Sequence, residues 1–203
     1  MINILKCNYN KAINVALYKN NIGFIPIHKN ASNTIKQKLK AIGFIEKNII
    51  NDDTIKYSII IREPIISWIK GLTTRIMICI LNNQITFEDS FNFLENDTNK
   101  IFEIVEFDVH TRPQIEYINL VKDIKIYPMD YMDKINGWFL KYNIKVEIPK
   151  PHFQDCFSIC GREQKIYDKL KKIIFENSQY FNIIKNYYKQ DIEIYNKILK
   201  DTL

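Results

Sequence analysis

The fold of this chain is decided by the stretch Gly23-Phe24-Ile25-Pro26-Ile27-His28-Lys29-Asn30-Ala31-Ser32-Asn33-Thr34-Ile35. Its apolar first half predicts a strand that is covered on both faces, as strands are in the centre of a parallel sheet. A polar turn follows, and then a helix begins. A strand–loop–helix of this kind directs backbone N–H groups and the positive end of the helix towards one point, which suits a phosphate or sulfate group. We therefore interpret residues 29–34 as an anion-binding loop.

The composition is that of an ordinary globular protein. The chain has 203 residues, of which 46% are hydrophobic and 26% are charged. This length fits one domain with a full core, so we predict a single domain over residues 1–203.

The charge balance indicates a polyanionic partner. The formal net charge of +6 suits a nucleotide, a nucleic acid or an acidic glycan. A lysine-rich surface also follows from AT-rich codon usage, and that alternative stays open. No dense basic run with interleaved aromatic residues is present, so we expect no dedicated nucleic-acid site.

The cysteines and the N-terminal residues bear on the compartment. The four cysteines are Cys7, Cys79, Cys156 and Cys160. Their spacing is a poor zinc signal, and we expect reduced thiols and no bound metal. No signal peptide or run of about 18 apolar residues is evident in the sequence. We therefore expect no membrane span and a cytoplasmic protein of bacterial or viral origin.

Alternating strands and helices predict an α/β protein. A helix over Thr34–Ile42, closed by Gly43, leads to a second buried strand over Ile55–Ile61, and Pro64 is placed to begin the next helix. This order is typical of a parallel sheet. Later elements are a helix over Thr86–Leu94 with a capping box, a loop over 96–99, a strand over Ile124–Tyr127, a helix over Tyr131–Tyr142, and helix from Arg162 to Lys200 with a break near Asn177.

Polar motifs stand at the ends of the first two strands. Lys29–Thr34 follows the first strand, and Arg62-Glu63-Pro64 follows the second. Because ligands of open parallel sheets bind beyond the carboxyl ends of the strands, we expect both motifs to face one crevice.

The first motif is not a Walker A loop, because it has no G-x-x-x-x-G-K-[ST] and its lysine precedes the turn. The segment His28–Ile35 instead resembles the 5′-phosphosulfate-binding loop of sulfotransferases that use 3′-phosphoadenosine 5′-phosphosulfate (PAPS). That loop runs roughly Pro/His-Lys-x-Gly/Ala-Ser/Thr-Thr-Ser-Ile/Leu. The chain departs from it at Asn33, where the family has a hydroxyl residue.

The second motif resembles the 3′-phosphate motif of the same family, an apolar strand followed by Arg-Asp/Glu-Pro and then Ser-Gly/Ala. Arg62, Glu63, Pro64 and Gly71 match, while Lys70 stands at the position of the family's serine. Two looser matches belong to the membrane-type and carbohydrate-modifying branch. They are the His-x-x-Pro-Gln segment within Asp108–Gln114 and the Tyr-x-x-Asp-x-x-x-Tyr pattern within Tyr187–Tyr195.

The resemblance implies a three-layer, parallel-sheet, P-loop-like sulfotransferase fold with a helical C-terminal part. It also implies PAPS as co-substrate, no metal, and a hydroxyl acceptor that we expect to be a glycan. Acceptor pockets are expected from the stretches 73–110 and 144–161.

The implied roles follow sulfuryl-transfer chemistry, in which the protein positions the groups and neutralises charge. Lys29 would stabilise the leaving phosphate. The 5′-phosphate would be held by loop residues Asn30, Ala31, Ser32, Asn33 and Thr34. Arg62 and Lys70 would bind the 3′-phosphate. His110 is the candidate general base, with Glu106 and Asp108 as competing bases.

Two other readings stay open. Asn33 and Lys70 depart from the family pattern, which favours a non-catalytic module that binds a nucleotide or a nucleic acid on the same fold. A nucleotide kinase is a further alternative, and the missing Walker lysine–serine pair argues against it.

Overall fold

The computed structural model describes residues 14–28, 32–107, 109–149 and 161–202. These residues form two compact units, which are described separately below. The described part of unit 1 comprises residues 65–107, 109–112 and 161–189. That of unit 2 comprises residues 14–28, 32–64, 113–149 and 190–202. The single domain expected over residues 1–203 stays a prediction.

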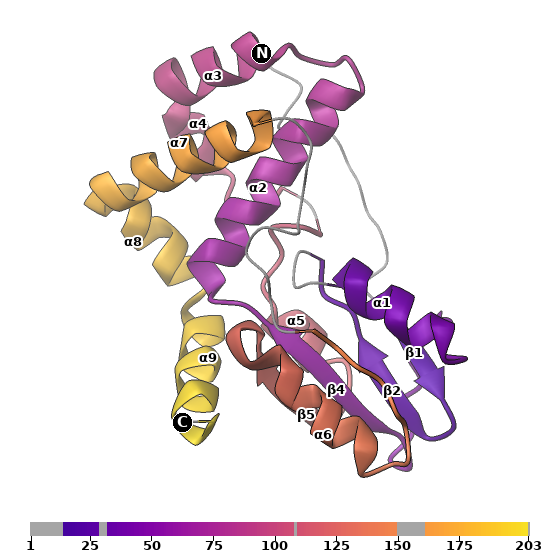
Figure 1. The fold of residues 1–203 in the computed structure, drawn as a ribbon. Helices are drawn as coiled ribbons and strands as arrows, with labels where there is room; N and C mark the ends of the chain where they lie inside the picture. The colour runs from indigo at the N-terminus through magenta and orange to yellow at the C-terminus, as the bar shows by residue number, and fades with distance from the viewer. Residues whose placement is uncertain (1–13, 29–31, 108, 150–160, 203) are drawn as a thin grey trace. The chain divides into compact units, whose positions relative to one another are not determined.

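Unit 2 contains a five-stranded sheet with the order β3-β1-β2-β4-β5 among the described residues (Figure 1). The strands are β1 (Val15–Lys19), β2 (Ile22–Ile25), β3 (Ile45–Asn48), β4 (Lys56–Ile61) and β5 (Ile124–Pro128). β2, β4 and β5 run parallel, whereas β1 is antiparallel to both of its neighbours. The α/β class is confirmed, but the expectation of a wholly parallel sheet is wrong.

A tight turn explains the antiparallel half of the sheet. Lys19 pairs with Ile22, so only Asn20 and Asn21 remain between β1 and β2. Asn20 has a φ of 54°, in the left-handed region that asparagine tolerates. A two-residue connection of this kind joins antiparallel strands only. β3 was not predicted, because it is short, mostly exposed and without apolar alternation.

The helices of unit 2 follow the sequence pattern in part. They are α1 (Ser32–Ala41), α5 (Ile115–Ile118), the 3-10 helix η2 (Met129–Lys134), α6 (Ile135–Leu140) and α9 (Lys189–Thr202), whose first residue belongs to unit 1. Gly43 closes α1 as predicted, with a φ of +90° that favours glycine. The helix expected over Tyr131–Tyr142 is instead the 3-10 helix followed by α6, because the backbone at Tyr131 is not helical.

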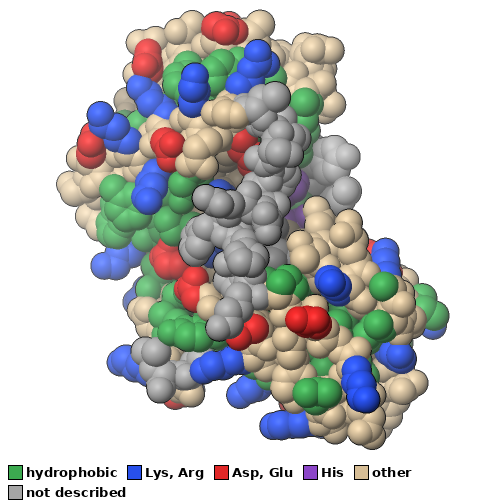
Figure 2. Space-filling model, viewed as in Figure 1, with side chains coloured by type: hydrophobic (Ala, Val, Ile, Leu, Met, Phe, Trp, Pro, Cys, Tyr) green, Lys and Arg blue, Asp and Glu red, His purple; other side chains and the backbone are tan. Residues whose placement is uncertain are grey.

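Charged side chains are spread over the surface. On the face shown in Figure 2, Lys and Arg side chains are scattered, with Asp and Glu side chains between them. In α1, Lys36 and Lys40 both contact Glu46, with N–O distances of 3.1 and 2.7 Å. The expectation that the protein has no dedicated nucleic-acid site stays a prediction.

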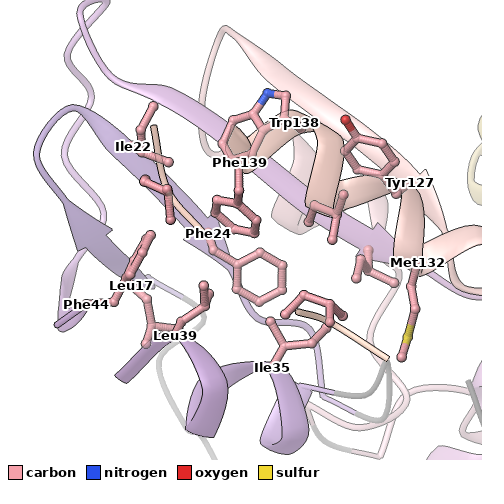
Figure 3. Packing of buried hydrophobic residues seen from close by; sticks show 14 residues of the cluster. Leu17, Ile22, Phe24, Ile35, Leu39, Phe44, Tyr127, Met132, Trp138 and Phe139 are labelled. Carbon is pink, nitrogen blue, oxygen red and sulfur yellow. The ribbon is translucent and has the colours of Figure 1, made fainter. Parts of the chain in front are cut away.

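Helices cover both faces of the sheet. On one face, Phe24 of β2 packs with Ile35 and Leu39 of α1 and with Phe139 of α6 (Figure 3). On the opposite face, strand side chains pack with Tyr117 of α5 and with residues of α9. Burying each large apolar side chain contributes about 1.5–3 kcal/mol, so these two layers hold the strand ends in place.

Unit 1 is helical in its described part. Its helices are α2 (Pro64–Leu81, of which Pro64 belongs to unit 2), α3 (Phe87–Asn96), α4 (Thr98–Glu103), α7 (Arg162–Glu176) and α8 (Ser178–Tyr187). The ring of Phe102 stacks on Trp68 and on Tyr180, with centroid separations of 5.8 and 4.0 Å. Pro64 begins α2 as predicted, and Cys79 is a buried free thiol.

α2 has the length and composition of a membrane span, with a mean hydropathy of 1.4. Of this helix, 72% is buried inside the protein, which is also the pattern of a core helix in a soluble protein. The expectation that no membrane span is present stays a prediction.

Two predicted boundaries need correction. The loop expected over 96–99 is reduced to Asp97, because α4 begins at Thr98. The C-terminal helix breaks at Asn177, as predicted, and again at Tyr188. Asn177 explains the first break, since its side chain accepts hydrogen bonds from the N–H groups of Gln179 and Tyr180 and so caps α8.

The capping box at the start of α3 is confirmed and gives a stability prediction. The Thr86 hydroxyl accepts from the Asp89 N–H, and the Asp89 carboxylate accepts from the Thr86 N–H, both at 3.0 Å. Replacing Thr86 with alanine is expected to lower the free energy of unfolding by about 1 kcal/mol in urea denaturation. Thr86→Ser keeps the acceptor and is expected to stay near wild type. Equal loss in both variants would contradict the capping role.

Candidate functional site

The strands that precede the two polar motifs in the sequence end at the same edge of the unit 2 sheet. β2 and β4 are parallel neighbours, with Ile25 opposite Ile59. Residues 26–28 therefore leave β2 at the edge where Arg62 and Glu63 leave β4. β5 ends at this edge too, since Ile61 lies opposite Pro128. The strands before the two motifs are thus adjacent and parallel, and the expectation that both motifs face one crevice stays a prediction.

The loop that follows β2 is described in part. Lys29, Asn30 and Ala31 lie outside the described residues. Ser32 is the first residue of α1 and is buried, whereas Asn33 and Thr34 are exposed in the first turn. This turn contains no acidic residue, so no carboxylate of its own offsets the positive end of the helix dipole.

Arg62 is held at both its backbone and its side chain. Its N–H donates to Gln114 Oε1 and its carbonyl accepts from Gln114 Nε2, both at 2.8 Å. The guanidinium Nε and Nη2 lie 3.0 and 2.8 Å from Met129 Sδ, just after β5. A thioether sulfur is a weak acceptor, and a phosphate oxygen would bind the same donors more strongly.

Asp191 holds the backbone of Gln114 by a hydrogen bond. Its two carboxylate oxygens accept from the N–H groups of Gln114 and Ile115, at 2.6 and 2.8 Å, and so cap the start of α5. Both Gln114 and Asp191 are buried. Burial raises the pKa of the Asp191 carboxyl from 3.8 to about 6, although the two backbone hydrogen bonds act in the opposite direction.

The same sheet edge also carries acidic and phenolic groups. The Tyr195 hydroxyl donates to Asp130 Oδ2 at 3.0 Å. Burial, followed by the charge of Asp130, raises the pKa of Tyr195. Tyr195 therefore stays a neutral hydrogen-bond donor at this edge.

Lys70 and His110 belong to unit 1. Lys70 Nζ lies 4.2 Å from the centroid of the Tyr167 ring, a cation–π distance. The backbone of His110 runs against α2 at Gly71, where a side chain would meet the His110 carbonyl oxygen at 2.1 Å. Gly71 of the second motif is thus explained by close packing of the chain.

Glu106 and Asp108 are the other two candidates for the general base. Glu106 is paired with Arg112 Nε at 3.3 Å and accepts from the Tyr187 hydroxyl at 2.6 Å. These contacts hold the Glu106 carboxylate in place, and the choice among the three candidate bases stays a prediction. Asp108 lies outside the described residues.

The sequence analysis placed Gln114 and Asp191 within the two looser motifs but assigned neither residue a role. The structure shows that the Tyr188 hydroxyl donates to the Thr111 carbonyl and that Asp191 binds Gln114. Their positions in the two looser motifs were the sequence signal that could have identified Gln114 and Asp191 as site residues.

An open hollow in unit 1 has a volume of about 570 Å³ and lies within the stretch expected to form the acceptor pocket. It is lined by the turn from α2 to α3, by the start of α3 and by Arg162. The Arg162 guanidinium lies 5.5 Å from the centroid of the Phe87 ring. Among the described residues, no group of three or more His, Cys, Asp and Glu side chains could hold a metal ion.

Comparison with known proteins found no matching family model, no similar curated protein and no similar solved structure.

Proposed function

We propose that this protein is a sulfotransferase that moves a sulfuryl group from PAPS to a hydroxyl group, with a carbohydrate as the expected acceptor. The observation that carries the proposal is the parallel pairing of β2 with β4. It brings the end of β2, which the Lys29–Thr34 segment follows in the sequence, and Arg62 to one edge of one sheet. A nucleotide with phosphates at its 5′ and 3′ positions needs two separate anion sites of this kind.

In this proposal PAPS supplies the sulfuryl group and a good leaving group, because its S–O bond to phosphate breaks as the acceptor oxygen bonds to sulfur. Lys29 neutralises the charge that develops on the departing 5′-phosphate. Residues Asn30–Thr34 hold that phosphate with backbone N–H groups and hydroxyls. Arg62 and Lys70 hold the 3′-phosphate, and His110 takes the proton of the acceptor hydroxyl.

The looser motifs add support. Gln114 ends the His-x-x-Pro-Gln segment and Asp191 is the acid of the Tyr-x-x-Asp pattern, and the two are hydrogen-bonded. Gln114 in turn holds Arg62 of the second motif. Residues selected by resemblance in three separate parts of the sequence are therefore joined in one network.

A second candidate is a non-catalytic nucleotide-binding module on the same fold. It is favoured by Lys70, whose ammonium group lies over the Tyr167 ring, and by Asn33, which supplies no hydroxyl to the loop. Turnover separates the candidates: transfer of labelled sulfate from PAPS to a mixture of glycans supports the enzyme, and nucleotide binding without transfer to any hydroxyl acceptor supports the module.

The test of the proposed site is calorimetry with 3′-phosphoadenosine 5′-phosphate, the product nucleotide. Wild type is expected to bind, and Lys29→Ala and Arg62→Ala are each expected to weaken binding by about 10-fold to 100-fold, as loss of a charged hydrogen-bond donor does. The matched control is Lys38→Ala, which removes the same charge from an exposed position on α1.

Three results would count against the proposal. They are no binding by wild type, equal binding by the Lys29 and Arg62 variants, or an equal loss in Lys38→Ala. Salt-dependent binding of DNA or RNA without affinity for the nucleotide would favour a nucleic-acid module instead.

A further inference from the structure

Three segments that are far apart in the sequence are connected by hydrogen bonds at the carboxyl edge of the unit 2 sheet. They are the residue after β4, the residue before α5 and the beginning of α9. The Gln114 side chain forms two hydrogen bonds to the backbone of Arg62, and the Gln114 N–H donates to Asp191. All three residues belong to unit 2.

The geometry makes Gln114 a fixed clamp. Its amide uses both its oxygen and its nitrogen on one residue, and so it holds the N–H and the C=O of Arg62 at the point where the β4 ladder ends. Only 2% of Gln114 is exposed. Turning the amide away would break both hydrogen bonds to Arg62 inside the protein, which is unfavourable for buried polar groups.

The side chain of Arg62 depends on this clamp. Its guanidinium Nε and Nη2 contact the sulfur of Met129. A bidentate contact with a phosphate requires the guanidinium to be aligned. The Arg62 backbone fixes the point at the sheet edge from which this side chain extends, and Gln114 holds that backbone.

We propose that Gln114 and Asp191 are positioning residues: Asp191 holds Gln114, and Gln114 holds the Arg62 backbone so that its guanidinium faces the 3′-phosphate of the nucleotide. This inference rests on the proposed function, because it assigns the 3′-phosphate to Arg62. Neither residue touches the nucleotide in this arrangement.

The experiment compares two nucleotides by calorimetry. The first is 3′-phosphoadenosine 5′-phosphate, and the second is adenosine 5′-phosphate, which has no 3′-phosphate. Gln114→Ala is expected to weaken binding of the first by about tenfold and to change binding of the second by less than about twofold. Arg62→Ala is expected to show the same pattern, and the double variant is expected to bind no more weakly than Arg62→Ala.

The controls separate positioning from general damage. Gln37→Ala removes an exposed glutamine of α1 in the same unit and is expected to leave both affinities unchanged. Gln114→Glu keeps the acceptor for the Arg62 N–H but loses the donor to its carbonyl, and it replaces Gln114→Ala if that variant does not fold. Asp191→Asn keeps one oxygen acceptor and is expected to lose less affinity for the first nucleotide than Gln114→Ala.

Amide hydrogen exchange at Arg62 gives a readout that needs no nucleotide. The Arg62 amide is expected to exchange slowly in wild type and faster in Gln114→Ala, while the amide of Ile60 within β4 changes little. Unchanged exchange at Arg62 would overturn the clamp itself.

The outcomes distinguish this inference from the proposed function. If wild type binds neither nucleotide, the proposed function fails and the assignment of a 3′-phosphate to Arg62 fails with it. If wild type binds 3′-phosphoadenosine 5′-phosphate and Gln114→Ala binds it equally well, the function stands and the positioning role is wrong. An equal loss for both nucleotides would also overturn it, because it would indicate a purely structural role.

Discussion

Replacing Gly71 with alanine is expected to destabilise unit 1 by about 3 kcal/mol or more, because the new methyl group has no room. An ideal Cβ at this position would lie 2.1 Å from the carbonyl oxygen of His110 and 2.7 Å from its carbonyl carbon. These are backbone atoms, so a change of side-chain rotamer cannot relieve the clash. Either α2 or the segment around His110 must move. The free energy of unfolding from urea denaturation measures the loss.

Gly137 provides the matched control. It lies inside α6, and a Cβ there would meet no atom within 4 Å. Gly137→Ala is expected to raise the free energy of unfolding by about 0.5–1 kcal/mol, since alanine is the better helix former. If Gly71→Ala were as stable as wild type, the close approach of His110 to α2 would be wrong.

The second large expected effect is that the free energy of unfolding depends on pH through the Asp191 carboxyl. Its pKa is raised from 3.8 to about 6 in the folded protein, mainly by burial. For a raised pKa, the stabilising contribution is fully present below pH 3.8 and is lost as the pH rises through about 6. Because each tenfold change in proton affinity is worth about 1.4 kcal/mol, the loss is expected to be about 3 kcal/mol.

The measurement is the free energy of unfolding of wild type minus that of Asp191→Asn, from pH 4 to pH 7. Asparagine does not titrate, and the other carboxylates largely cancel in the difference. The difference is expected to fall by about 2.4 kcal/mol over this range, because part of the full loss already occurs below pH 4. A flat difference would show that the carboxyl is not desolvated as the structure indicates.

The variant Asp52→Asn tests the sign of the pH dependence of stability, because the pKa of Asp52 is shifted in the opposite direction to that of Asp191. Hydrogen bonds from the Thr54 backbone and side chain lower the pKa of the Asp52 carboxyl, which is exposed. Its contribution is present above the ordinary pKa and is lost as the pH falls, so the wild-type-minus-variant difference should rise with pH. The same trend in Asp191 and Asp52 would contradict one of the two assignments.

Local signals predicted much of the fold. The largely apolar runs of β2 and β4, the proline that begins α2, the glycine that ends α1 and the capping box of α3 each act within a few residues. β3 carries no such signal, since its position depends on pairing with β1 rather than on its own side chains. A parallel sheet was predicted because the alternation of strands and helices was followed from Gly23 onwards, and the turn at Asn20 and Asn21 lies before that residue.

The candidate site, like the fold, was predicted from the sequence only in part. The sequence by itself determined that a lysine loop and an Arg-Glu-Pro motif follow two buried strands, because strand runs and helix starts are local patterns. Only the tertiary structure decided that these strands are parallel neighbours and that Gln114 and Asp191 hold Arg62. The physical reason is that hydrogen bonds between residues tens of positions apart form only after the chain has folded. Their partners therefore leave no periodic trace in the sequence.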